Sequence, residues 1–126
     1  KKLINSFMPG QFTLIIKAKP GLPEWAINKQ DGTIGLRVPD YDLVRNLIRK
    51  VGKPLLVPSA NKAGEPPANT VEEVENVFEN EISGVFAGFS TSKTPSTIVL
   101  IKDENIILIR EGNISLDEIN KVLEEA

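Results

Sequence analysis

The sequence predicts a mixed domain, α/β or α+β, in which helices flank a mixed sheet. Short runs rich in β-branched residues alternate with amphipathic segments of helical period along the 126 residues, with no internal repeat. The composition, 40% hydrophobic and 25% charged residues, is typical of a globular domain with a sizeable core. No shift in composition marks an internal boundary, so we expect residues 1–126 to form one domain.

The first half of the chain is expected to supply two strands and then a helix. Residues 13–18 and 33–38 are rich in β-branched residues, and prolines and glycines separate them. A helix should follow, because Asp40 can cap it and Gly52 can end it. Its apolar residues recur at the helical spacing i, i+3, i+4 and i+7: Val44, Leu47, Ile48 and Val51.

The middle of the chain is expected to supply a short strand, a long loop and a second helix. Residues 55–57 form an apolar run typical of a buried strand, and the polar, proline-rich residues 59–69 are typical of a loop. Thr70, followed three residues later by Glu73, forms a capping box that predicts the start of the second helix.

The last third of the chain is expected to be sheet followed by a helix. Strand composition is found in three segments: residues 85–87, 96–101 and 106–110. The turn at residues 102–105 predicts that the last two form a hairpin. Ser115 and Glu118 form another capping box, which predicts a terminal helix.

The residue inventory excludes several classes of chemistry. The chain has no histidine and no cysteine, so thiol nucleophiles, histidine-based triads and histidine-ligated zinc are excluded. Lysines and arginines number 15 against 17 aspartates and glutamates, a net charge of −2 that argues against strong nonspecific binding of nucleic acid. The apolar runs are far shorter than the roughly 20 residues that span a membrane, so no membrane partner is expected.

The polar loop after residues 55–57 is the most suggestive local feature. Ser59 and Asn61 place a hydroxyl and an amide at the carboxyl end of the expected strand, where open α/β sheets usually bind ligands. The same pair is also typical of a turn that its side chains stabilise through hydrogen bonds to the backbone. Local chemistry leaves both interpretations open.

Two arginines lie at the ends of apolar strand segments. Arg37 can bind a phosphate or carboxylate through two parallel hydrogen bonds, or it can lie on an exposed strand face. Arg110 ends the apolar run at residues 106–109, and Ser96 opens the preceding strand. These residues line one cleft only if the order of the strands brings their ends together.

Five segments that cover nearly the whole chain resemble a known family. They are residues 7–14 (FMPGQFTL), 34–40 (IGLRVPD), 54–64 (PLLVPSANKAG), 96–99 (STIV) and 109–114 (IREGNI). In this order they are similar to the signatures of the YrdC-like threonylcarbamoyl-AMP synthases, and the Pro-Ser-Ala-Asn loop is the most specific match. The resemblance implies a YrdC-like fold, with a twisted sheet and an open concave cleft.

The resemblance also implies an activity. The intact family member is a nucleotidyltransferase that condenses L-threonine, bicarbonate and ATP to threonylcarbamoyl-adenylate and pyrophosphate, for modification of an adenosine in tRNA. ATP and Mg²⁺ are the implied cofactors, and tRNA or the downstream tRNA-modifying complex is a further implied partner. The implied location is the cytoplasm.

Family motifs assign roles to six residues by resemblance. In the family, a Lys-x-Arg pair and a Ser-x-Asn pair hold the nucleotide. The implied catalytic residues are Arg37, Ser59 and Asn61; the implied nucleotide-binding residues are Ser59, Asn61, Ser96 and Arg110; and the implied substrate-binding residues are Thr13 and Arg37. No metal ligand is implied. Nothing in the sequence corresponds to the Lys-x-Arg pair, so we expect the chain to be the C-terminal part of the family domain, and its own activity stays open.

Two alternatives remain. One is a YrdC-like carbamoyltransferase module, which would form an adenylate from carbamoyl phosphate instead of threonine. The other is a noncatalytic fragment that binds a nucleotide or RNA, for which the acidic balance of charges is unfavourable.

Overall fold

A computed structural model describes residues 1–90 and 94–125 of the chain. The chain divides into two compact units, Lys1–Leu55 with Thr94–Ala126 and Leu56–Lys93. Both units fall within the single domain expected from the sequence, and that assignment stays a prediction. No helix in the described residues has the length and apolar character that a membrane span requires.

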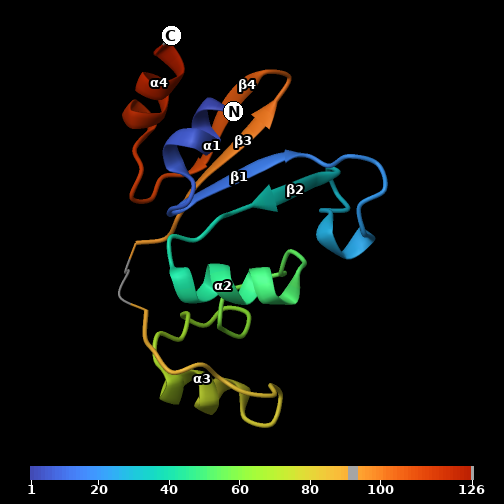
Figure 1. Ribbon diagram of the computed structural model, residues 1–126, viewed down its shortest axis with the longest axis vertical. Helices are drawn as coiled ribbons and strands as arrows, with labels where there is room; N and C mark the ends of the chain where they lie inside the picture. The colour runs from blue at the N-terminus through green and yellow to red at the C-terminus, as the bar shows by residue number, and fades with distance from the viewer. Residues whose placement is uncertain (91–93, 126) are drawn as a thin grey trace. The chain divides into compact units, whose positions relative to one another are not determined.

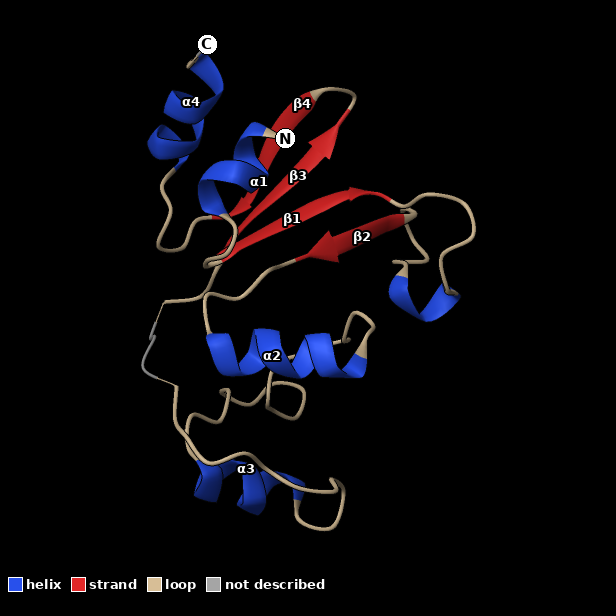
Figure 2. Cartoon of the chain, in the orientation of Figure 1, coloured by secondary structure: helices blue, strands red, loops and turns tan. Residues whose placement is uncertain are grey.

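The first unit contains a four-stranded mixed sheet with the order β2-β1-β3-β4, which Figures 1 and 2 show. Its strands are β1 (Phe12–Lys17), β2 (Thr33–Leu36), β3 (Thr97–Lys102) and β4 (Asn105–Arg110). β1 pairs antiparallel with β2 and parallel with β3, and β3 and β4 form an antiparallel hairpin. The predicted α/β class, the two early strands and the hairpin are therefore confirmed.

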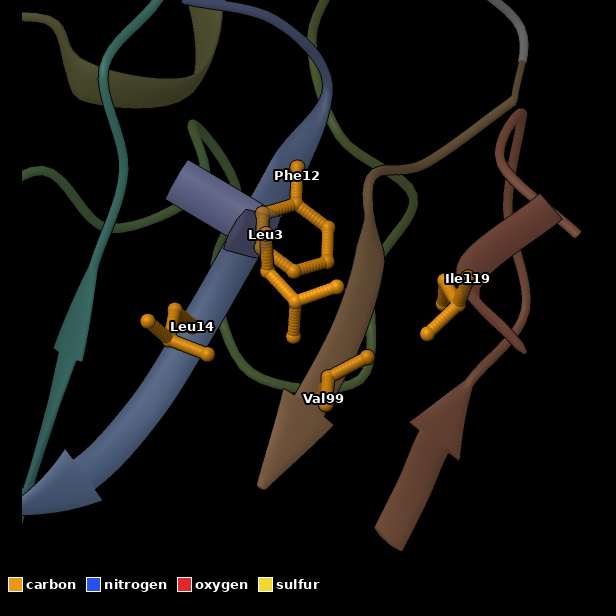
Figure 3. Close-up of a cluster of buried hydrophobic side chains, with 5 residues drawn as sticks. All are labelled: Leu3, Phe12, Leu14, Val99 and Ile119. Atoms are coloured by element: carbon orange, nitrogen blue, oxygen red, sulfur yellow. The ribbon is translucent and has the colours of Figure 1, made fainter. Parts of the chain in front are cut away.

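One face of this sheet packs against helices α1 (Lys2–Phe7) and α4 (Leu116–Glu124). Figure 3 shows the buried cluster, to which the two helices and strands β1 and β3 contribute: Leu3, Phe12, Leu14, Val99 and Ile119. Successive strand residues point to opposite faces of a sheet. The intervening residues, among them Thr13, Ile15, Ile98 and Leu100, therefore belong to the opposite face, which we call the second face.

The predicted helix starts are partly confirmed. Ser115 and Glu118 form the complete capping box of α4. Helix α3 (Val71–Phe78) begins after Thr70, whose side chain accepts a hydrogen bond from the backbone N–H of Glu73. The carboxylate of Glu73 accepts from the N–H of Asn69 instead of that of Thr70, so this box closes one residue earlier than expected.

The predicted N-cap of the helix expected after Asp40 is wrong. Helix α2 (Asp42–Val51) ends at Gly52 in the left-handed conformation, as expected, but its N-cap is Tyr41, which makes no capping hydrogen bond through its side chain. Asp40 lies one residue too early to cap, and its carboxylate is paired instead with the guanidinium of Arg45, 3.1 Å away.

Two further predicted strands are also wrong. Residues 55–57 and 85–87 form no strand, and Val57 and Phe86 are 77% and 67% exposed. Prolines flank residues 55–57 on both sides, and proline cannot donate to a ladder. Near residues 85–87, only an isolated bridge joins Phe89 to Thr70 among the described residues. An apolar run without a partner strand does not become sheet.

Candidate functional site

Three predicted site residues meet at one end of the sheet in the first unit. The hydroxyl oxygens of Thr13 and Ser96 lie 3.0 Å apart. Arg110 donates from Nε to the carbonyl oxygen of Ser96 at 3.0 Å, and from Nη2 to its hydroxyl oxygen at 3.3 Å. Ser96 is 8% exposed and is hydrogen-bonded to both Thr13 and Arg110. We call these three residues the hydroxyl–arginine cluster.

The parallel pairing of β1 with β3 explains why the two hydroxyls meet. The register places Phe12 beside Thr97 and Thr13 beside Ile98. Ser96 is two residues before Ile98, so its side chain shares the second face with that of Thr13. Residues far apart in the sequence are thus brought together by a strand pairing that local sequence patterns do not reveal.

A β-bulge directs Arg110 into the cluster. In the β3–β4 hairpin, Val99 pairs with Leu108, but the next pair along the strand is Ile98 with Arg110. Ile109 is therefore an extra residue, and Arg110 shares the second face with Ile98. In a regular strand Arg110 would share the face of Leu108, which packs against the core. Bulges of this kind commonly redirect side chains beside active sites.

Arg37 belongs to the same end of the sheet. The β1–β2 register pairs Ile15 with Gly35 and Leu14 with Leu36, so continuing it by one residue places Arg37 opposite Thr13 on the second face. Arg37 is exposed and makes no ion pair or hydrogen bond with any residue that the structure describes. Its charge is therefore not neutralised by a carboxylate of the described chain.

Gly35 is a site feature that sequence reasoning missed. A Cβ built at Gly35 would lie 3.9 Å from the γ-methyl carbon of Thr13, with no closer neighbour. Because Gly35 has no side chain, nothing at this position covers the second face beside Thr13 and Arg37. A glycine inside a strand is a recognised signal for close approach of a ligand or backbone, and this signal was present in the sequence.

The chemistry of this end of the sheet is that of an anion site. Arginine and hydroxyl side chains supply hydrogen-bond donors, and arginine suits bidentate binding of phosphates and carboxylates. Arg110 donates to two oxygens of Ser96, and this residue is neutral. Across residues 1–90 and 94–125, no group of three or more acidic, histidine or cysteine side chains could hold a metal ion. The described residues therefore offer no cage of three or more such ligands that would hold Mg²⁺ without substrate phosphates.

Ser59 and Asn61 belong to the second unit, so the hydroxyl–arginine cluster does not include them. The N–H of Asn61 donates to the carbonyl oxygen of Ser59 at 3.0 Å, and its Nδ2 donates to that of Lys62 at 3.1 Å. These bonds are those of a local turn. The Oδ1 atom of Asn61, however, is buried without a hydrogen-bond partner, and a buried acceptor without a donor is costly. The turn interpretation therefore leaves one polar atom unexplained.

Comparisons with known proteins agree with the geometry. The Sua5/YciO/YrdC family, described as "Telomere recombination", matches residues 1–112. A Methanocaldococcus jannaschii protein provisionally named threonylcarbamoyl-AMP synthase is 37% identical over 120 residues, which are 94% of this chain and 55% of that protein. The threonylcarbamoyl-AMP synthase of Bacillus subtilis is 33% identical over 124 residues, which are 98% of this chain and 36% of the enzyme. The chain thus spans only part of these relatives.

Solved structures show the same fold. The structure of P. abyssi Sua5 complexed with L-threonine superposes with a TM-score of 0.85 at 28% identity, covering 98% of this chain and 36% of that one. The structure of E. coli YciO gives a TM-score of 0.73 at 24% identity, covering 93% of this chain and 57% of that one. By its family match and its fold, the chain belongs to the Sua5/YciO/YrdC family.

Proposed function

We propose that the chain supplies part of the active site of a threonylcarbamoyl-AMP synthase. The full protein would condense L-threonine, bicarbonate and ATP to threonylcarbamoyl-adenylate and pyrophosphate, in the cytoplasm, for the modification of tRNA. The observation that supports this most strongly is the hydroxyl–arginine cluster together with Arg37, whose guanidinium donors form no ion pair with a carboxylate of residues 1–90 and 94–125. Relatives named for this reaction support it independently.

The proposed reaction needs positioned charge more than a proton-transfer base. The amine of threonine adds to bicarbonate with loss of water to give a carbamate. A carbamate oxygen then attacks the α-phosphorus of ATP, so that a new P–O bond forms and the bond to the leaving pyrophosphate breaks. Reactions of this type depend mainly on orientation and on electrostatic stabilisation of the phosphate oxygens. A chain without histidine is therefore suited to it.

Each site residue has a proposed role. Arg37 and Arg110 bind phosphate or carboxylate groups of the substrates, because both present guanidinium donors on the second face. Thr13 and Ser96 orient the bound groups through their hydroxyls. Ser59 and Asn61 bind the nucleotide. The buried Oδ1 of Asn61 supports this role, because this acceptor has no hydrogen-bond donor among the described residues and could accept from the ligand.

Mg²⁺ is the remaining part of the proposal. The side chains of the cluster itself are hydroxyls and a guanidinium, with no carboxylate among them, and Mg²⁺ is commonly held by one or two carboxylates together with substrate phosphates. We therefore assign the ion to the triphosphate of the incoming ATP and derive no step from it.

The test is an assay of pyrophosphate release by the full-length protein, with ATP, Mg²⁺ and bicarbonate, in the presence and absence of L-threonine. We expect release that depends on threonine, and a loss of at least about tenfold, or about 1.4 kcal/mol, for Arg110→Ala. An unchanged rate in Arg110→Ala would remove the cluster from the site.

The two alternatives give different results in the same assay. Release that depends on added carbamoyl phosphate, and not on threonine, would indicate a carbamoyltransferase. No release with either substrate, together with salt-sensitive retention of RNA on a filter, would indicate a noncatalytic binding module.

A further inference from the structure

Thr97 lies directly behind the hydroxyl–arginine cluster, on the core side of β3. It is the first residue of this strand and has no exposed surface. We infer that Thr97 is a positioning residue, which holds Arg110 against Ser96 without touching the substrate. Its importance for catalysis rests on the proposed function, whereas its effect on Arg110 can be measured without any activity.

The Thr97 hydroxyl forms three hydrogen bonds with the segment that follows Arg110. Its Oγ1 accepts from the N–H of Gly112 at 2.9 Å and from the N–H of Ile114 at 3.1 Å. It donates to the carbonyl oxygen of Ile114 at 2.7 Å. A hydroxyl has one donor and two acceptor sites, so its full capacity is used on this one segment.

These bonds take over where the strand pairing ends. The β3–β4 ladder stops at the pair Ile98–Arg110, just beyond the bulge. β4 ends at Arg110, and in the segment that follows it the Thr97 side chain accepts from two N–H groups, those of Gly112 and Ile114. Both bonds are part-buried, and an N–H that is withdrawn from water without a partner is costly, so the hydroxyl fixes the segment at this point.

Gly112 permits the close approach that these bonds require. A Cβ at this position would overlap the carbonyl oxygen of Pro95 and would lie 2.9 Å from the amide nitrogen of Thr97. The glycine is therefore needed for space, because no side chain fits between the two backbones. Thr97 and Gly112 together form what we call the β3–β4 clamp.

The clamp fixes both partners of the contact between Arg110 and Ser96. Ser96 is the residue before Thr97, and Arg110 lies two residues before Gly112. The N–H of Thr97 also donates to the carbonyl oxygen of Gln11 at 3.1 Å, which ties the clamp to the residue before β1. With both backbones held, the guanidinium of Arg110 meets Ser96 in a defined geometry.

The experiment compares Thr97→Val with Thr97→Ser in the full-length protein. Valine keeps the shape of threonine and removes the hydroxyl, whereas serine keeps the hydroxyl. Leu3→Ala serves as a stability control, because Leu3 is 4% exposed in the core but belongs to α1, outside the clamp. The primary measurement is the chemical shift and hydrogen exchange of the Arg110 Nε–H, assigned by its disappearance in Arg110→Lys.

We expect Thr97→Val to shift the Arg110 Nε–H signal and speed its exchange, and to lower kcat/KM for ATP by about tenfold or more through lost orientation. Thr97→Ser should restore both, and Leu3→Ala should lower the melting temperature without moving the Arg110 signal. A wild-type Arg110 signal in folded Thr97→Val would overturn the inference.

Two further measurements keep the result unambiguous. If Thr97→Val does not fold, exchange of the Gly112 and Ile114 amides in the wild-type protein decides: protection like that of ladder amides supports the clamp, and rapid exchange overturns it. If the wild-type protein shows no threonine-dependent activity, the proposed function fails, but the Arg110 signal still reports whether Thr97 positions this side chain.

Discussion

The hydroxyl of Thr13 lies 3.0 Å from the hydroxyl of Ser96, although 83 residues separate them in the chain. The same Ser96 hydroxyl accepts a hydrogen bond from Nη2 of Arg110. One serine oxygen therefore links the start of β1 to the end of β4 across the intervening strand β3. Removing only the hydroxyl of Ser96 should therefore disturb the whole cluster while changing the shape of one side chain very little.

Ser96→Ala should impair the proposed reaction more than it impairs folding. The substitution removes a hydroxyl that both Thr13 and Arg110 contact, so the guanidinium keeps only the carbonyl oxygen of Ser96 as a recorded acceptor. We expect threonine-dependent pyrophosphate release to fall about tenfold, and the free energy of unfolding to fall by about 1 kcal/mol.

The matched control is Ser6→Ala, at an exposed position in α1. It removes the same hydroxyl group away from the cluster and should leave pyrophosphate release unchanged. Equal rates for the two alanine variants would contradict the role given to Ser96.

Arg37→Ala should weaken substrate binding without destabilising the fold. Arg37 makes no ion pair within the described part of the chain, so its removal breaks no salt bridge there. We expect kcat/KM in the pyrophosphate assay to fall at least about tenfold, with an unchanged melting temperature. Arg49→Ala is the control, because Arg49 is an exposed arginine of α2; a similar loss in both variants would show a general effect of charge.

The sequence predicted most elements of the first unit because their signals are local. A run rich in β-branched residues marks β1, the β3–β4 hairpin follows from two apolar runs around a short polar turn, and the capping box of Ser115 marks the start of α4. Helix α1 was not predicted, although Leu3 and Phe7 have helical spacing and both contact the core.

The cluster itself could not be predicted from local patterns. Its assembly depends on the parallel register of β1 with β3 and on the extra residue Ile109, and neither feature has a signature in a short window of sequence. The strand prediction for residues 55–57 was wrong for a related reason, because an apolar run becomes a strand only where another strand pairs with it. Whether Ser59 and Asn61 act with the cluster remains a prediction.

Gly112→Ala should destabilise the first unit strongly. The added Cβ would overlap the backbone of Pro95 and Thr97, and backbone atoms cannot move aside as a flexible side chain can. We expect a loss of about 1–3 kcal/mol or more in the free energy of unfolding, measured by urea titration. Gly84→Ala, where a Cβ meets no atom within 4 Å and no positive φ is required, should be neutral; equal losses would contradict the close packing at Gly112.

Ser115→Ala should remove the cap of α4. The Ser115 side chain accepts from the N–H of Glu118 at 3.2 Å, and the Glu118 carboxylate accepts from the N–H of Ser115 at 2.7 Å. Loss of an N-cap costs about 1 kcal/mol, and the effect should reach the core because Ile119 of this helix is fully buried. Ser115→Asp should retain most of the stability, since aspartate also caps; a stable alanine variant would contradict the capping role.

Asp31 should make the free energy of unfolding depend on pH, through its hydrogen bonds near the start of β2. Its carboxylate accepts hydrogen bonds from the hydroxyl and the N–H of Thr33, at 2.6 and 3.0 Å. These bonds hold the pKa of Asp31 below its ordinary value. A pKa that is lower in the folded state means that the stabilisation is present at pH values above the pKa of the unfolded chain, and is lost as the pH falls through the folded pKa.

The check is a carboxyl NMR titration of Asp31, together with urea unfolding of the wild-type protein and Asp31→Asn at neutral pH and at about pH 3, below the ordinary aspartate pKa. Asparagine does not titrate, so the stability difference between the two proteins should shrink as the solution becomes acidic. Because Asp31 is exposed, water screens the effect, and a small difference is expected. A difference that grew on acidification would reverse the sign and contradict the role of the Thr33 hydrogen bonds.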